Sequence, residues 1–404
     1  MRRRVRGLKA LIHDAVDFTA DMVEEGHASI RRNALRVLDV SPELSGPAKL
    51  ADGVYRASLA ITLGSVRGVN HAVRFITDAG LEPVLGRLAD EAEPIEMRSD
   101  IAGTAAWISD AALGALNGAV GDYLQRSNNP LDLGLSLRFR DRYLDATSGT
   151  PELPARLAVY VHGLGTTEWS WCFNAFEAHG DAAQCFGTLL EKDAGLAPLF
   201  VRYNSGRRVV ENGSLLADAL ERAFEQRLPQ ELVLVGHSMG GLVLQSACHQ
   251  AVERGYGWPS RVSRVFSLGS PHQGAPLEQL GSAAATLLAG IDWPSTRIPG
   301  EILRRRSAGM QDLRRGQVLD GDEPARLLPQ ASYYFVSATI TSDPHHPLGW
   351  LAGDVLVRVP SASGPARMDP GAHFETSCLG GMVHQELQNH PDVYAVLKRA
   401  CAGG

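Results

Sequence analysis

Residues 231–240 read ELVLVGHSMG, and this stretch decides the fold. An apolar run leads into a G-x-S-x-G pentapeptide, and the helix-compatible segment GLVLQSACHQAVER follows it directly. This pattern between a strand and a helix predicts a sharp turn that presents Ser238 at the carboxyl end of a sheet. The glycines two residues either side of the serine leave room for the strand and the helix to approach each other. A chance match in a chain with 42 glycines is the alternative, and the flanking strand and helix argue against it.

The sequence on both sides of this turn repeats the same pattern of an apolar run followed by a turn. From residue 157 onward, short apolar runs end in glycine-bearing turns, and helical segments separate several of them; the runs are LAVYVHG, PLFVRYNSG, ELVLVGHS, RVFSLGSP and YYFVSATI. Continuous apolar strands alternating with helices predict a parallel sheet with right-handed connections that is covered on both faces. The sequence therefore predicts an α/β-hydrolase fold with a mostly parallel sheet and helices on both faces.

The chain before residue 131 has a different pattern. Apolar residues recur every three or four positions in 5–38 and 66–76, and residues 101–124 are rich in alanine, so we expect a helical N-terminal extension over residues 1–130. The catalytic domain is expected over 131–404, beginning with an edge or surface strand in LSLRFRDRYL. The segment 273–330 exceeds the length of a simple crossover, which predicts a cap insertion there.

A second glycine-bearing turn supplies an expected oxyanion hole. VYVHGLG at 159–165 is an apolar strand that runs into a glycine-rich loop, where this fold places half of its oxyanion donors. Preorganised backbone N–H groups stabilise the negative charge that develops on the carbonyl oxygen during acyl transfer. We assign these donors to Leu164 and Met239. His162 precedes the loop, and its position favours a structural role over that of a catalytic base.

A serine hydroxyl needs a histidine base and a carboxylate that orients the base, and in this fold the chain order is serine, acid, histidine. His384 is the expected base, because HPDVYAVLKRA at 390–400 reads as the final helix and the base precedes that helix. His390 is the second candidate, although its place beside Pro391 is typical of a helix entry. Asp354 in GDVLV is the expected acid, with Asp343 in SDPHHP as its competitor.

The remaining composition restricts partners and cofactors. A formal net charge of -6 provides no basis for nucleic-acid binding. The spacing of Asp343, His345 and His346 matches no established metal site, and we expect neither a metal nor a cofactor. Five cysteines without a CxxC pair favour reduced thiols over a disulfide framework. The expected partner is a small-molecule or lipid ester.

The N-terminus bears on localisation. A basic cluster opens the chain, but Asp14 and Asp17 interrupt it before an apolar stretch of signal-peptide type develops, so we expect a cytoplasmic protein. The same basic cluster beside an amphipathic helix leaves two readings open. The helix contacts a membrane surface peripherally, or it packs on the catalytic domain with its basic end in solvent.

The motifs together resemble a bacterial group of lipase- and esterase-like α/β-hydrolases that is related to GPI inositol-deacylase-like proteins. The resemblance covers roughly residues 157–400 and rests, beyond the serine turn, on VHGLGTTEWSW, RYNSGRRVVENG, SLGSPHQGAPLE, RSAGMQDLRRG, GDVLV and VHQELQNHPDVYAVL. It implies a nucleophile at Ser238, an acid at Asp354 and a base at His384. Relatives usually have G-D-G-L-V, so Val355 departs from the family pattern.

These observations predict a serine hydrolase that cleaves carboxylic esters through an acyl-enzyme. An acyltransferase or an amidase could use the same residues, because the triad defines the nucleophile and leaves the acceptor open. The alternative from a different functional class is a membrane-surface or scaffold module in which catalysis is secondary.

Overall fold

The computed structural model describes residue 70 and residues 101–144, 152–275, 307–321, 323–365 and 372–402. The fold below is that of the compact unit formed by residues 93–128, 132–292 and 305–404. The helices predicted over 5–38 and 66–76, and residues 276–306 of the predicted cap, lie outside the described residues apart from Asn70.

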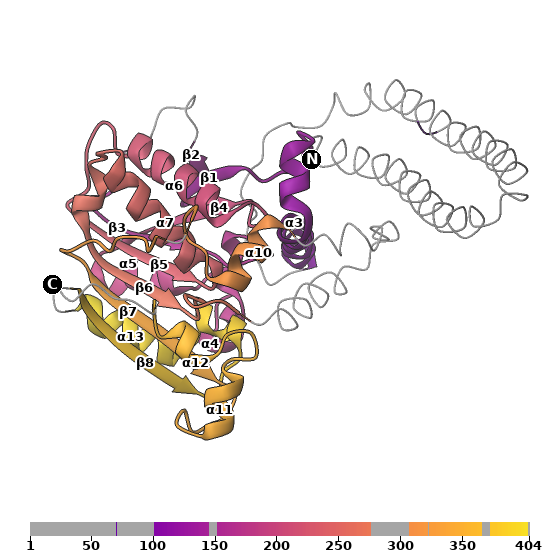
Figure 1. Ribbon diagram of the computed structural model, residues 1–404, viewed down its shortest axis with the longest axis vertical. Coiled ribbons are helices and arrows are strands. Elements are labelled where there is room, and N and C mark those ends of the chain that lie inside the picture. Colours follow the sequence, from indigo (N-terminus) through magenta and orange to yellow (C-terminus); the bar gives the residue numbers. More distant parts are fainter. Residues whose placement is uncertain are drawn as a thin grey trace, which may run out of the picture. The chain divides into compact units, whose positions relative to one another are not determined.

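The centre of this unit is an eight-stranded sheet in the order β2-β1-β4-β3-β5-β6-β7-β8 (Figure 1). Strand β1 runs antiparallel to both β2 and β4, and all other neighbouring strands are parallel. The strands are β1 (Leu135–Phe139), β2 (Arg142–Leu144), β3 (Arg156–Val161), β4 (Ala197–Tyr203), β5 (Glu231–His237), β6 (Val262–Leu268), β7 (Ser332–Thr339) and β8 (His373–Gly380).

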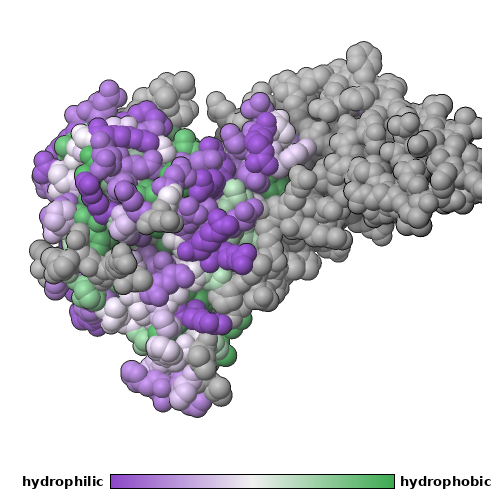
Figure 2. All heavy atoms as spheres, in the orientation of Figure 1, coloured by the Kyte–Doolittle hydropathy of each residue, from purple (hydrophilic) through white to green (hydrophobic). Residues whose placement is uncertain are grey.

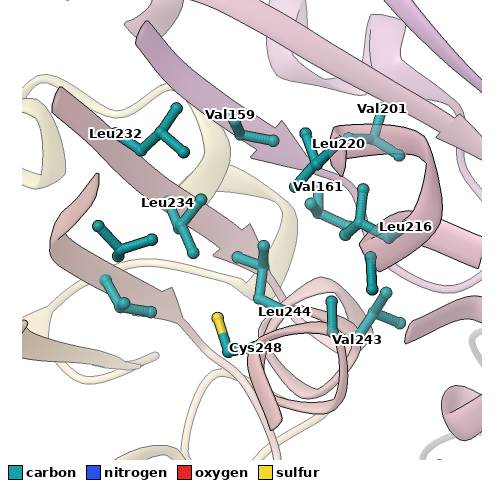
Figure 3. Packing of buried hydrophobic residues seen from close by; sticks show 14 of the residues in the cluster. Val159, Val161, Val201, Leu216, Leu220, Leu232, Leu234, Val243, Leu244 and Cys248 are labelled. Atoms are coloured by element: carbon teal, nitrogen blue, oxygen red, sulfur yellow. The ribbon is translucent and has the colours of Figure 1, made fainter. Parts of the chain in front are cut away.

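Helices cover both faces of the sheet. Alternate residues of a strand point to opposite faces, and along β3 Val159 joins one apolar cluster whereas Tyr160 joins the other. Figure 3 shows Leu216 of α6 (Val209–Ala223) and Val243 of α7 (Met239–Glu253) packed over the first face. Helices α5 (Phe186–Ala194) and α13 (Pro391–Cys401) cover the second face. The predicted α/β-hydrolase fold is therefore confirmed. The helices are α3 (Ile101–Arg126), α4 (Ala175–His179), α5 (Phe186–Ala194), α6 (Val209–Ala223), α7 (Met239–Glu253), α10 (Ala308–Arg315), α11 (Pro347–Ala352), α12 (Val359–Ala362) and α13 (Pro391–Cys401), with 3-10 turns η1 (Glu168–Cys172), η2 (Trp258–Arg261) and η3 (His384–Gln388).

One predicted strand and one predicted domain boundary differ from the structure. The single edge or surface strand expected at 135–144 is a hairpin, because the chain turns at Arg140 with φ 54° and pairs β1 with β2. Strand β1 is internal to the sheet, and its residues Leu137 and Phe139 are buried. The expected boundary at residue 130 separates α3 from the catalytic domain, whereas α3 lies in the same compact unit as the sheet.

Helix α10 falls within the predicted cap range 273–330 and packs on the catalytic unit. The amide of Gly309 donates to the carbonyl of Gly206 at 3.0 Å, and the Ser307 hydroxyl donates to the carbonyl of Gly118 in α3 at 2.6 Å. This part of the range is therefore integral to the compact unit.

The face of the described unit that Figure 2 shows is mainly polar. Figure 2 shows apolar residues in small patches between polar ones on the visible face. Within the described ranges, no helix combines the length and the apolar character that crossing a membrane requires. All five cysteines are free thiols.

The fold predicts a sharp steric limit at Gly240, where α7 crosses β3. A Cβ atom on Gly240 would lie 2.1 Å from the carbonyl oxygen of Val161. We expect Gly240→Ala to lower the free energy of unfolding by about 1–3 kcal/mol, because the backbone of β3 cannot give way as a side chain can. Urea denaturation measures this change. Gly257→Ala is the matched control, since its Cβ would meet only the end of the Leu228 side chain at 3.2 Å; an equal loss in both variants would contradict the argument.

Candidate active site

Ser238 lies at a strained turn between β5 and α7. Its backbone has φ 54° and ψ −123°, a conformation that costs a non-glycine residue on the order of 1–3 kcal/mol. The turn is tight, because a Cβ on Gly236 would lie 2.5 Å from the amide nitrogen of Gly241. The strand and helix on either side of the predicted turn are therefore present, and the turn brings the serine to the carboxyl end of β5.

The predicted acid and base are in direct contact. His384 Nδ1 lies 2.7 Å from Asp354 Oδ2, and both side chains are buried. The other carboxylate oxygen, Asp354 Oδ1, accepts from the amides of Leu356 at 3.0 Å and Val357 at 2.8 Å. These bonds hold an acceptor-only carboxylate, so Nδ1 of His384 carries the proton and Nε2 is the basic nitrogen.

The candidate nucleophile and the candidate base line one cavity. Ser238, His384 and Leu164 all line it, and His384 Nε2 is buried without a hydrogen-bond partner among the described residues. A buried basic nitrogen without a partner is available to accept a proton from a group that enters the cavity. The cavity is lined mainly by apolar side chains and glycines, and its lining residues are Ala115, Gly118, Ala119, Gly163, Leu164, Gly165, Thr166, His237, Ser238, Met310, Leu313, Leu356, Val357, His384, Gln385 and Gln388.

Residues 163–167, called the oxyanion loop below, pass beside Ser238. A Cβ on Gly163 would lie 3.0 Å from Ser238 Cβ, which places the following amide of Leu164 next to the serine. The loop is held by the Gly165 amide, which donates to Ser205 Oγ at 2.9 Å. Met239 is the first residue of α7, and the first amides of a helix have no acceptor within it. Both predicted donors thus lie at the two backbone segments that flank Ser238.

His162 is buried behind the oxyanion loop. Its Nδ1–H donates to the carbonyl of Gly163 at 2.9 Å, and its ring stacks on Tyr203 at a centroid distance of 4.3 Å. Burial lowers the pKa of His162 to about 3, so the ring is neutral at physiological pH. These contacts are those of a residue that holds the loop, in line with the role expected from the sequence.

His237 is a site residue that the sequence did not single out. Its Nε2–H donates to the backbone carbonyl of His384 at 3.0 Å, and the two rings are 4.7 Å apart. Burial, followed by the neighbouring His384, lowers the pKa of His237, so it remains uncharged beside the base. The residue stands within the pentapeptide, but nothing in the local sequence shows that its ring faces η3.

The two alternative candidates have other contacts. Asp343 is exposed, and its Oδ1 accepts from the amide of His345 at 2.9 Å, as in an ordinary turn. His390 is the N-cap of α13, where its Nδ1 accepts from the amide of Asp392 at 3.2 Å. Within the described ranges, no three His, Cys, Asp or Glu residues are grouped so that they could hold a metal ion.

The comparisons with known proteins bear on the segment that contains the serine turn. Residues 201–286 match the family model of the PGAP1-like alpha/beta domain. The PGAP1-like segment includes β5, the serine turn, α7 and β6, and the match confirms the family resemblance there. Among curated protein sequences, none matches the chain.

Solved structures with a similar chain path include two bacterial enzymes. The RedJ thioesterase from the prodiginine biosynthetic pathway in Streptomyces coelicolor is 19% identical, with a TM-score of 0.38; the match covers 65% of this chain and 91% of that chain. The carboxylesterase CesB (YbfK) from Bacillus subtilis is 14% identical, with a TM-score of 0.34, and the match covers 74% of this chain and 98% of that chain.

The buried neutral His162 predicts a loss of stability in mild acid. The unfolded chain binds a proton below a pKa of about 6.5, whereas the folded chain does so only near 3, so the stabilisation is complete above pH 6.5 and declines as the pH falls toward 3. We expect His162→Gln to reduce the slope of unfolding free energy against pH between 6.5 and 4 by up to about 1.4 kcal/mol per pH unit. Urea denaturation across this range measures it. Equal slopes in wild type and His162→Gln would contradict the assignment.

The turn after the acid predicts a stabilising substitution. Val355 has φ 83°, which is unfavourable for a β-branched residue, and its side chain is 49% exposed. We expect Val355→Gly to raise the free energy of unfolding by about 1 kcal/mol, because glycine adopts this φ freely and little packing is lost. Val383, exposed but with φ −96°, is the control: Val383→Gly should lower stability. A loss of stability in both variants would show that Val355 is unstrained.

Proposed function

We propose that this chain hydrolyses carboxylic esters through an acyl-enzyme formed on Ser238. The observation that carries the proposal is the buried Asp354–His384 pair, whose basic nitrogen opens onto the same cavity as the strained serine. A nucleophile, a base and a group that orients the base are the elements of nucleophilic acyl transfer.

The roles follow from the contacts. His384 Nε2 accepts the hydroxyl proton as Ser238 Oγ attacks the ester carbonyl, and Asp354 keeps Nδ1 protonated and stabilises the imidazolium. The amides of Leu164 and Met239 donate to the oxygen that becomes negative. His384 then gives its proton to the departing alcohol. A water molecule, deprotonated in turn by His384, releases the acid and restores Ser238.

The lining of the cavity supports an ester with an apolar group. The side chains of Ala115 and Ala119 from α3, Met310 and Leu313 from α10, and Leu356 beside the acid all contribute to it. Apolar walls with a few polar groups at the reacting centre are typical of sites for small organic ligands. We therefore propose small-molecule or lipid esters as the substrate class. Membrane contact through the N-terminal helix stays a prediction, since that helix lies outside the described residues.

The triad predicts which substitutions abolish activity. We expect Ser238→Ala and His384→Asn to lower kcat/KM for p-nitrophenyl esters by about 10⁴-fold or more, because each removes a group that acts only with the others. Steady-state hydrolysis of a series from acetate to palmitate measures this loss and the preferred chain length. His390→Asn and Asp343→Asn are matched controls on the rejected candidates, and they should retain wild-type rates.

Two results would contradict the proposal. Undiminished hydrolysis by Ser238→Ala would exclude the serine as nucleophile. Formation of an ester or amide in preference to free acid, when an alcohol or amine is added to the assay, would instead show an acyltransferase that uses the same residues.

A further inference from the structure

Helix α3 packs directly against the backbone of the oxyanion loop. On successive turns of the helix, Asp110 accepts a hydrogen bond from Thr167 Oγ1 at 2.7 Å, and a Cβ on Gly114 would lie 2.8 Å from the carbonyl carbon of Thr166. One turn further, a Cβ on Gly118 would lie 2.5 Å from Gly165 Cα. The helix therefore contacts three consecutive loop residues in reverse order, with no space between the two backbones.

Two further hydrogen bonds fix the position of α3. The carbonyl of Gly118 accepts from Ser307 Oγ at 2.6 Å, and the carbonyl of Gly121 accepts from Asn204 Nδ2 at 2.8 Å. Ser307 is the N-cap of α10, and Asn204 directly follows β4. The helix is thus tied both to the loop and to two other elements of the catalytic unit, so it cannot move without breaking buried hydrogen bonds.

A buried ion pair ties α3 to the central sheet. Both carboxylate oxygens of Asp110 lie 2.9 Å from Arg202 Nη2, and Arg202 Nε lies 2.7 Å from Glu168 Oε2. All three side chains are buried. Arg202 belongs to β4, and Glu168 begins η1 directly after the oxyanion loop. A buried charge that loses its partner is strongly unfavourable, so this network holds α3 and the end of the loop in one arrangement.

We propose that α3 is a positioning element for the oxyanion hole, with Gly118, Asp110 and Thr167 as positioning residues. The inference rests on the function proposed above and extends it to a helix outside the motifs of the triad. Leu164 lies between Gly163, which touches Ser238, and Gly165, which touches Gly118. The position of the Leu164 amide relative to the serine is therefore set by how closely α3 approaches. An oxyanion donor acts only at hydrogen-bond distance from the developing charge, so a small displacement weakens it.

The choice of residues in α3 supports this role. Glycine is among the least favourable residues in the interior of a helix, yet Gly114 and Gly118 both face neighbouring atoms at distances that exclude a Cβ, and Gly121 does so directly after the kink at Val120. Ala115 and Ala119, on adjoining positions, line the cavity above Ser238. The same helix therefore shapes both the wall of the cavity and the loop that carries the donor.

The test compares three variants of the full chain, Gly118→Ala, Asp110→Asn and Thr167→Val. We expect kcat for p-nitrophenyl acetate to fall by about 10–100-fold with little change in KM, part of the loss expected for removing an oxyanion donor. The rate at which a fluorophosphonate labels Ser238 should fall in parallel, because that reaction also places negative charge in the oxyanion hole. Thr167→Val removes one hydroxyl and leaves the Asp110–Arg202 pair in place, so this variant is expected to fold. It therefore tests the proposal even if the other two variants fold poorly. Asp122→Asn, on the same helix but paired with Arg126, is the matched control and should retain both rates.

The outcomes separate this inference from the proposed function. Wild-type hydrolysis and labelling that persist at equal rates in folded variants would overturn the positioning role and leave the serine mechanism intact. A raised KM at unchanged kcat would also overturn it, because α3 would then act only as a wall for the substrate. A wild-type protein that neither hydrolyses the ester nor is labelled at Ser238 would overturn the proposed function, and this inference with it.

Discussion

The structure depends on the close backbone approach of β3, β5 and α7 around Ser238. No Cβ fits at Gly236 or Gly240, and Gly163 crosses the serine itself at a distance that leaves little space for one. Side chains at these positions would separate the strand, the helix and the oxyanion loop. The strained backbone of Ser238 persists because the apolar packing of α7 on the sheet is extensive enough to hold it.

The candidate acid and base follow β7 and β8 at the same carboxyl edge of the sheet, and other contacts hold them. Asp354 lies in a turn rather than in a strand, and its position comes from two backbone amides and the imidazole of His384. His384 is in turn held through its carbonyl by His237, which precedes the nucleophile. The serine turn and the base are therefore linked directly, so a displacement of one is transmitted to the other.

Buried polar groups in this unit surround the site. The Asp110–Arg202–Glu168 network and the neutral rings of His162 and His237 lie beside or behind the oxyanion loop and the triad. Such groups contribute little net stability, since their desolvation offsets much of their attraction, but they favour one arrangement over its alternatives. The proposed oxyanion hole, which would have to hold backbone donors to within a fraction of an ångström, would benefit from that selectivity.

The sequence by itself determined the serine turn, the alternation of strands and helices, and the order of the candidate acid and base. These signals are local, because the turn requires glycines at set positions and a buried parallel strand requires a continuous apolar run. Asp354 and Asp343 could not be separated in the same way, since both follow β7 and only contact with His384 distinguishes them. The tertiary structure alone assigned α3 to the catalytic unit and split residues 135–144 into a hairpin. In the local sequence the glycines of α3 only lower the helix propensity. The reason for them is the close approach of a loop that lies more than 40 residues away in the chain. Contacts of that kind arise from packing between distant segments, which no local pattern encodes.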